Sequence, residues 1–312
     1  MAFTGKLILL ALFPGALFLV VGGTVAGSAL SGMRGMITGA CDRGPAMGIR
    51  DMAALLTGEC IPTGGALHAV CWLAPAVRLL ALSWISCIVF GLYEGDLALV
   101  YSLLVLAGAA DLALCFFSIS PRVRQNVWVE AVSLMGWAVP LALVMVTVLI
   151  RTDQASVGGV VEWQSKYGVL LGSAEGGAAA VVGTALAFAA VLLCCQVMVR
   201  LRPFSQGYFS DPPAGLAAEI SGPPAAFLVA ARGGALVVVP LLLIALFLAG
   251  PAGSPLQVLF WVLKVVGLVL LLGIADAVAP RARSDRVLLW CLIVGGAMAA
   301  LGLVLVWLGV SP

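Results

Sequence analysis

The sequence predicts an all-α polytopic membrane protein with about eight transmembrane helices. The 312-residue chain is 63% hydrophobic and only 10% charged, whereas soluble domains are about 25% charged. Eight apolar runs are each long enough, at roughly 18 residues or more, to cross a bilayer core as a helix. The runs are too long for strands, and they lack the alternating pattern of an outer-membrane barrel.

We place the eight spans, in chain order, near residues 7–30, 67–90, 97–118, 127–150, 174–199, 226–249, 255–278 and 287–309. The first run follows Lys6 and continues without a charge to residue 30. This run is too long for the core of a signal peptide, and no clear cleavage site ends it. We therefore expect a retained span, and we treat residues 1–312 as a single transmembrane domain.

Basic residues gather in alternate connections between the spans. The odd-numbered connections carry ten of them: Arg34, Arg43, Arg50, Arg122, Arg124, Arg200, Arg202, Arg281, Arg283 and Arg286. The opposite side carries three, namely Lys6, Arg151 and Lys166. Because cytoplasmic loops hold the excess of Lys and Arg, we expect both termini outside and the odd-numbered connections in the cytoplasm.

The two longest cytoplasmic loops, residues 31–66 and 200–225, are rich in Gly and Pro yet keep apolar stretches. Long loops between membrane helices are often functional or docking segments. We therefore expect these loops to form the docking face for a partner. On the other side, the polar connection 151–173 is long enough for a short amphipathic helix.

Ionisable residues inside the spans are the main functional signal. A charged side chain at the bilayer centre costs roughly 2.5–3.5 kcal/mol on insertion scales. The candidates are Arg78, Asp111, Glu130, Glu175, Glu219, Arg232, Lys264 and Asp276. Together they indicate a buried polar track that relays protons or binds a polar head group. The alternative is charge pairing that fixes helix packing, with snorkelling near the span ends.

Other kinds of site receive little support. The eight cysteines form no Cys-x-x-Cys pair, and most lie inside spans, where cysteine behaves as a small apolar residue. The single histidine, His68, stands at a span boundary. We therefore expect no metal site and no catalytic residue in this chain. Nucleic acid binding is also not expected, because no basic patch carries interleaved aromatic residues.

The first cytoplasmic loop resembles that of the complex I subunit 1 family, also called the NuoH family. Arg43-Gly44-Pro45 leads to a segment in which Asp51, Leu55 and Glu59 keep the spacing of the family's Asp-x-x-Lys-Leu-x-x-Lys-Glu. The family's two lysines are replaced, by Ala54 and Gly58.

Later segments are similar to the same family in the same order. They are Gly95-Asp96-Leu97 before the third span, Glu130 at the start of the fourth, Arg202-Pro203-Phe204, and Glu219-Ile220-Ser221-Gly222. The acidic residues of the second long loop are depleted, with Ser205 in place of an Asp and only Asp211 before Glu219. A second glutamate usual in the fourth span is also missing.

The resemblance implies a membrane subunit that carries a peripheral electron-transfer arm in the bacterial or archaeal cytoplasmic membrane. The eroded acidic loop and the lost lysines favour energy-converting nickel–iron hydrogenases, of the formate hydrogenlyase or CO-linked type, over complex I. Implied partners are hydrogenase-like large and small subunits, a ferredoxin-like iron–sulfur subunit and an antiporter-like membrane subunit. The nickel–iron centre and the iron–sulfur clusters belong to those partners, and no cofactor is expected in this chain.

On this interpretation the chain couples redox chemistry in the arm to proton translocation. The expected proton pathway comprises Asp111, Glu130, Asp211, Glu219 and Lys264, and the expected docking contacts are Arg34, Arg43, Arg50, Asp51, Glu59 and Arg202. Three alternatives remain: a quinone-site subunit of a complex I-like dehydrogenase, a structural anchor without ion translocation, and an unrelated secondary transporter. The transporter would favour broken helices and internal symmetry, and the sequence shows no internal repeat.

Overall fold

A computed structural model of the protein describes residues 10–12, 14–38, 47–59, 66–117, 127–173, 175–198, 222–249, 255–278 and 290–310. Within these residues every named element is a helix, and a single isolated β-bridge joins Asp96 to Ser156. The prediction of an all-α membrane protein is confirmed.

Six helical stretches in the described part of the chain are long and apolar enough to cross a membrane. They lie in α4 (Ala66–Val89), α5 (Leu97–Phe117), α7 (Val127–Thr152), α9 (Gly177–Met198), α11 (Pro223–Leu243) continued by the π-helix η1 (Ile244–Leu248), and the π-helix η2 (Cys291–Gly295) continued by α14 (Gly296–Val310). These stretches match six of the eight predicted spans in order. The remaining two, at 7–30 and 255–278, correspond to α2 (Ala16–Thr38) and α12 (Pro255–Val278), which contain shorter apolar stretches. The count of eight and the orientation stay predictions.

The predicted boundary of the first span is wrong. Helix α2 begins at Ala16, just after Pro14, and it continues to Thr38. Proline suits a helix start better than a helix interior, and the helix continues past residue 30 into the segment that we assigned to the first loop. Arg34, which we expected in that loop, therefore lies within α2.

Two short helices lie in the connections. Helix α3 (Met47–Thr57) forms inside the first long loop, where Met52 is buried and Leu56 is exposed. Helix α8 (Val157–Tyr167) confirms that the connection 151–173 contains a short helix. The Ser156 hydroxyl caps the start of α8 by accepting a hydrogen bond from the Gly159 N–H, which satisfies one of the free N–H groups of the first turn.

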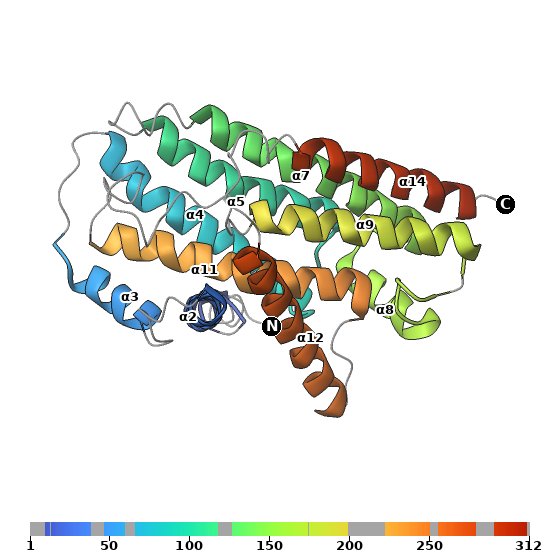
Figure 1. Ribbon diagram of the computed structural model, residues 1–312, viewed down its shortest axis with the longest axis horizontal. Coiled ribbons are helices and arrows are strands. Elements are labelled where there is room, and N and C mark those ends of the chain that lie inside the picture. The colour runs from blue at the N-terminus through green and yellow to red at the C-terminus, as the bar shows by residue number, and fades with distance from the viewer. Residues whose placement is uncertain are drawn as a thin grey trace.

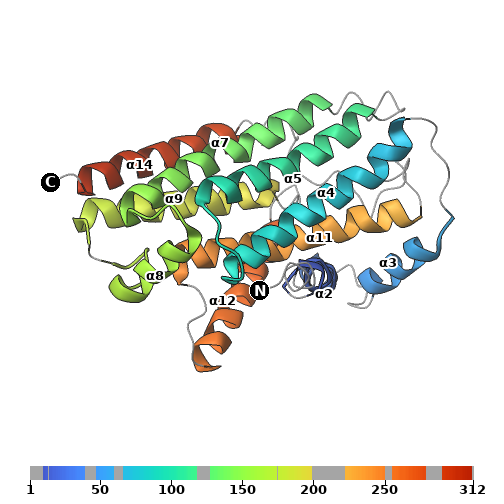
Figure 2. The ribbon, with the colours of Figure 1, turned by 180° about the vertical axis from the view of Figure 1, so that it is seen from behind.

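The long helices lie side by side along one axis (Figures 1 and 2). Helices α4, α5, α7, α9, α11 and α14 run lengthwise, α2 is seen end-on where it crosses them, and α12 slants away. Helices α4, α7 and α11 begin, and α5 finishes, at one end of the bundle. We call this end the α3 end. The opposite end, where α8 lies and α14 finishes, is the α8 end.

Small residues allow the helices to approach closely. A Cβ atom added to Gly23 in α2 would lie 2.3 Å from the carbonyl carbon of Gly233 in α11, and one added to Gly183 in α9 would lie 2.6 Å from the Gly302 oxygen in α14. Such small-residue contacts are a common basis of helix association in membranes. The contact with α2 fixes α11, the helix with the most buried side chains, in the middle of the bundle.

Candidate functional site

A buried carboxylate near the α3 end lies between two guanidinium groups from neighbouring helices. Arg78 of α4 donates a hydrogen bond to the Asp111 carboxylate of α5 and forms an ion pair with it. Arg232 Nη2 of α11 lies 3.8 Å from the other Asp111 oxygen. The side chains of Arg78 and Asp111 are only 5% and 3% exposed, and that of Arg232 is 14% exposed. Three helices are thus joined through one carboxylate.

The position of these residues along their helices explains why they meet. Arg78 lies twelve residues after the start of α4, Asp111 lies six before the end of α5, and Arg232 lies nine after the start of α11. All three are therefore within a few turns of the same end of the bundle. Burying a charge without a partner is costly, so helices that place opposite charges at similar depth gain stability by facing them toward one another.

Apolar side chains enclose this ionic contact. On the side of the α3 end lies a cluster of small and aliphatic residues from α4, α5 and α11: Cys71, Ala74, Ala110, Leu114, Cys115, Ala225 and Leu228. Leu55 of α3 and Val127 of α7 pack against that cluster. Helix α3 thus contacts, through Leu55, an apolar cluster on the three helices that carry the charged residues.

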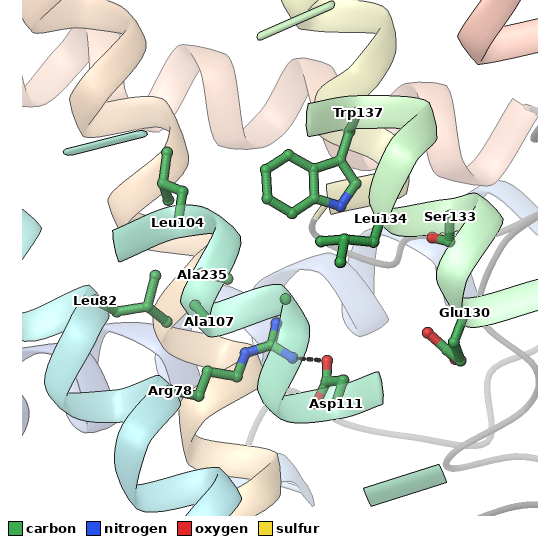
Figure 3. Close-up of a pocket in the computed structure, with 11 residues that line it drawn as sticks. Arg78, Leu82, Leu104, Ala107, Asp111, Glu130, Ser133, Leu134, Trp137 and Ala235 are labelled. Atoms are coloured by element: carbon green, nitrogen blue, oxygen red, sulfur yellow. Dashed lines mark hydrogen bonds and ion pairs between the residues drawn. The ribbon is translucent and has the colours of Figure 1, made fainter. Parts of the chain in front are cut away.

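Glu130 faces the ionic contact across a small cavity. The cavity measures about 30 Å³, and its polar lining consists of Arg78, Asp111, Glu130 and Ser133, with Trp137 closing one side (Figure 3). Glu130 and Ser133 project from adjacent turns of α7, opposite the Arg78–Asp111 pair. A volume of roughly 10–15 Å³ by this measure holds one water molecule. The site therefore has room for about two water molecules between the carboxylates.

Lys264 lies elsewhere. Its Nζ donates a 2.6 Å hydrogen bond to the carbonyl oxygen of Leu248, the last residue of η1. A cation at this position also interacts favourably with the negative end of the helix dipole. Leu248 is sixteen residues beyond Arg232 on the α11–η1 helix, so the structure does not bring Lys264 together with Asp111 and Glu130.

The remaining predicted site residues have different positions. Glu59 follows α3 and is exposed, Arg50 and Asp51 belong to α3, and Arg34 belongs to α2. Four residues lie outside the described ranges: Arg43, Arg202, Asp211 and Glu219. Of the expected proton pathway, the described part of the chain therefore brings together Asp111 and Glu130.

Sequence reasoning placed Arg78 and Arg232 among the membrane charges but did not assign them to the site. The positions of Arg78 and Arg232 along their helices could have identified them as site residues, because both lie about as far from one membrane face as Asp111 does. Six cysteines in the described residues are buried. Within the same residues, no group of three or more His, Cys, Asp or Glu side chains is placed to hold a metal ion.

Comparison with known proteins gives a family match and a structural match. The model of the family described as NADH dehydrogenase matches residues 37–307. A solved chain of the membrane-bound sulfane sulfur reductase, an archaeal respiratory membrane complex, has a similar fold. The TM-score is 0.75 at 21% sequence identity, and the similarity covers 93% of this chain and 98% of that chain. No curated protein matches this sequence.

Proposed function

Because the chain belongs to the NADH dehydrogenase family, whose model matches residues 37–307, we propose that it is the membrane-anchor and proton-pathway subunit of a multisubunit redox complex. The complex we propose resembles an energy-converting hydrogenase, in which a peripheral arm performs the redox chemistry. This chain couples that chemistry to proton translocation. The sulfane sulfur reductase that contains a chain of similar fold is itself a respiratory membrane complex, and this supports assignment to such an assembly.

The buried Asp111 carboxylate between Arg78 and Arg232, with Glu130 across the cavity, is the observation that carries the proposal. Glu130 thus places a second carboxyl group beside an ionic contact that joins α4, α5 and α11. We propose that proton uptake at this carboxyl group changes the forces between the three helices.

The size of such a coupling can be estimated. Two unit charges about 10 Å apart interact by about 1.7 kcal/mol at an effective dielectric constant of 20, and about 1.4 kcal/mol corresponds to a tenfold change in an equilibrium constant. We propose that a charge moved at the arm interface acts on the site through an interaction of this order.

The docking face lies next to the site. We propose that loops 31–66 and 200–225 hold the peripheral arm, with Arg34, Arg43, Arg50 and Arg202 among the contacts. Helix α3 lies within the first of these loops, and its Leu55 packs on the apolar cluster of α4, α5 and α11. Movement of the arm against α3 thus has a short route to Arg78, Asp111 and Arg232.

The cavity beside Glu130 favours proton transfer over quinone chemistry. Pockets for drug-sized ligands usually measure about 300–1,000 Å³, whereas this cavity measures about 30 Å³. It therefore suits water molecules, which transfer protons between Glu130 and Asp111, and not a quinone ring. We propose that Asp211 and Glu219 continue the pathway toward the arm, and that Lys264, at the other end of α11, stabilises the helix.

Neutralising the two carboxylates in the native complex tests the proposal. We expect Glu130→Gln to lower proton translocation per electron by at least about tenfold, with redox activity and assembly retained. Asp111→Asn should impair both translocation and assembly, because it leaves two guanidinium groups without their common carboxylate. Translocation is measured with a pH-sensitive dye in inverted membrane vesicles while the redox rate is recorded in parallel.

Glu162→Gln is the matched control, because Glu162 lies on the exposed face of α8 with its side chain 67% exposed. This variant should behave as the native complex does. If Glu130→Gln and Asp111→Asn leave both coupling and complex activity intact, the chain is a structural anchor and the proton pathway is wrong.

A further inference from the structure

We propose that Gln164 is a positioning residue that sets the Arg232–Asp111 contact from the opposite end of the bundle. Its effect on proton coupling rests on the proposed function, whereas its effect on the contact does not. Gln164 belongs to α8, a short helix that lies beside the last part of α11 (Figure 2). Hydrogen bonds join α8 to the far ends of the two helices that carry Asp111 and Arg232.

The first connection runs from α8 to α11. Gln164 Nε2 donates to the carbonyl oxygens of Ala245 at 3.1 Å and Leu246 at 2.7 Å. Both carbonyls belong to η1, the π-helical continuation of α11, and lie within the last turn of that helix. The last carbonyl groups of a helix have no intrahelical donor. They therefore depend on donors from other elements.

The Gln164 side chain is well suited to this connection. It is buried, at 2% exposure, and a buried amide is costly unless its polar atoms are hydrogen-bonded. Its Nε2 makes two hydrogen bonds, while Oε1 accepts none from the described residues. The amide can donate two hydrogen bonds from one nitrogen without bringing a charge into the apolar core. The same helix end accepts the hydrogen bond from Lys264, so donors from α8 and α12 together fix the position of η1.

The second connection runs from α8 to α5. The Leu97 N–H donates to the Ala155 carbonyl at 2.8 Å, and the Val157 N–H donates to the Gly95 carbonyl at 3.1 Å. These bonds form the isolated bridge around Ser156, the capping residue of α8. Leu97 and Val157 are the first residues of α5 and α8, respectively. The start of α8 is therefore fixed to the start of α5 by backbone atoms alone.

The two connections lie at similar distances from the ionic contact. Leu97 precedes Asp111 by fourteen residues, and Ala245 follows Arg232 by thirteen. At about 1.5 Å per residue, each separation is about 20 Å. Because α5 and α11 run antiparallel, α8 joins both at one end and thereby sets their offset along the helix axes at the other.

The ionic contact is sensitive to that offset. Arg232 Nη2 and Asp111 Oδ1 are 3.8 Å apart, longer than a direct hydrogen bond. Helices in proteins slide by about 1–2 Å during functional transitions. A slide of α11 by this amount either closes the gap to a hydrogen bond or separates the two groups. Gln164 determines which of these positions the helix adopts.

A double-mutant cycle between Gln164 and Arg232 tests the inference in the intact native complex. The variants are Gln164→Met, which keeps the side-chain length but removes the donor, Arg232→Gln, and the two combined. Glu162→Gln, alone and with Arg232→Gln, is the matched control from the exposed face of α8. The first readout is the temperature at which half of this chain is lost from the soluble complex, measured by mass spectrometry of its peptides. The second readout is the pH profile of proton translocation.

Residues about 20 Å apart normally act additively. We expect instead that Gln164→Met lowers the melting temperature in the native background and has at most about half of that effect beside Arg232→Gln. We also expect Gln164→Met to shift the pH profile, and Glu162→Gln to leave the pH profile unchanged and to lower the melting temperature only slightly. Additive melting shifts would overturn the positioning role, and so would an unchanged pH profile in a complex that translocates protons. Failure of the proposed function is recognised separately, as intact coupling in the Glu130→Gln variant.

Discussion

Replacing Arg151 with methionine should destabilise the α8 end of the bundle by about 3 kcal/mol. We expected Arg151 in the connection after the fourth span, but it lies in the last turn of α7 and is only 6% exposed. Its Nη1 donates to the Ala180 carbonyl and to Thr184 Oγ1 at 2.9 Å. Its Nη2 donates to the Ser173 carbonyl at 2.8 Å, to Ser173 Oγ at 3.1 Å and to the Glu175 carbonyl at 3.3 Å.

The magnitude follows from these five contacts. Side-chain hydrogen bonds inside membrane proteins contribute about 0.6 kcal/mol each on average, which gives about 3 kcal/mol for the set. For a chain of 312 residues, 1 kcal/mol shifts the melting temperature by about 1.5 °C. Arg151→Met should therefore lower the melting temperature by about 5 °C.

The assay is thermal loss of the chain from the detergent-solubilised complex, followed by its peptides. Lys166→Met is the control, because Lys166 is 63% exposed and pairs with Glu162 on α8. Arg151→Lys should fall between the native protein and Arg151→Met, since an ammonium group keeps the charge but lacks the planar fork that reaches several acceptors. A melting temperature of Arg151→Met equal to that of Lys166→Met would refute the view that these contacts stabilise the bundle.

Two further predictions concern helix packing and surface charge. Gly23→Val should prevent α2 from packing on α11, because even a Cβ atom at Gly23 would lie 2.3 Å from the Gly233 backbone. The measurement is the amount of this chain that co-purifies with the complex. Gly27→Val is the control, because a Cβ atom at Gly27 meets nothing within 4 Å. A hydrogen bond and charge attraction from Lys166 lower the pKa of Glu162, and the same contact with Glu162 raises the pKa of Lys166. The pair therefore stabilises α8 between these two values, and its contribution disappears as the pH falls through the folded-state pKa of Glu162 or rises through that of Lys166. Glu162→Gln should accordingly have a small effect on melting that is largest near neutral pH and vanishes in high salt; an effect that persists in acid would contradict this assignment.

The sequence predicted the helices better than their arrangement. Hydropathy locates apolar runs, and the spans at 97–118 and 226–249 agree with α5 and α11–η1 to within a few residues. Hydropathy carries no information on direction, so neither the crossing of α2 nor the slant of α12 followed from it. The close contact between Gly23 and Gly233 also became visible only in the structure.

The site was predictable in its residue types but not in its pairings. The high cost of a charge in a bilayer selected Asp111 and Glu130, and the structure places both at one cavity; their role in a proton pathway stays a prediction. That argument selects every charge in a span equally, and it therefore included Lys264 as well. A sequence does not show which backbone carbonyls will accept a hydrogen bond from another helix. In the structure, the Leu248 carbonyl accepts a hydrogen bond from the Lys264 ammonium group.

The two ends of the bundle stabilise their cations in different ways, and this difference separates the residues that can respond to a proton from those that cannot. At the α8 end, the recorded acceptors of Arg151 and Lys264 are backbone carbonyls and hydroxyl groups, which do not titrate. At the α3 end, Arg78 and Arg232 share the carboxylate of Asp111 beside a second carboxyl group, Glu130. A cation held by a titratable group changes its interactions when a proton arrives. At the α8 end, Arg151 also attracts the Glu175 carboxylate, but its hydrogen bonds to carbonyl and hydroxyl groups do not depend on that carboxylate. Protonation therefore changes the forces between helices more at the α3 end, and the α8 end supplies a more constant frame against which that change acts.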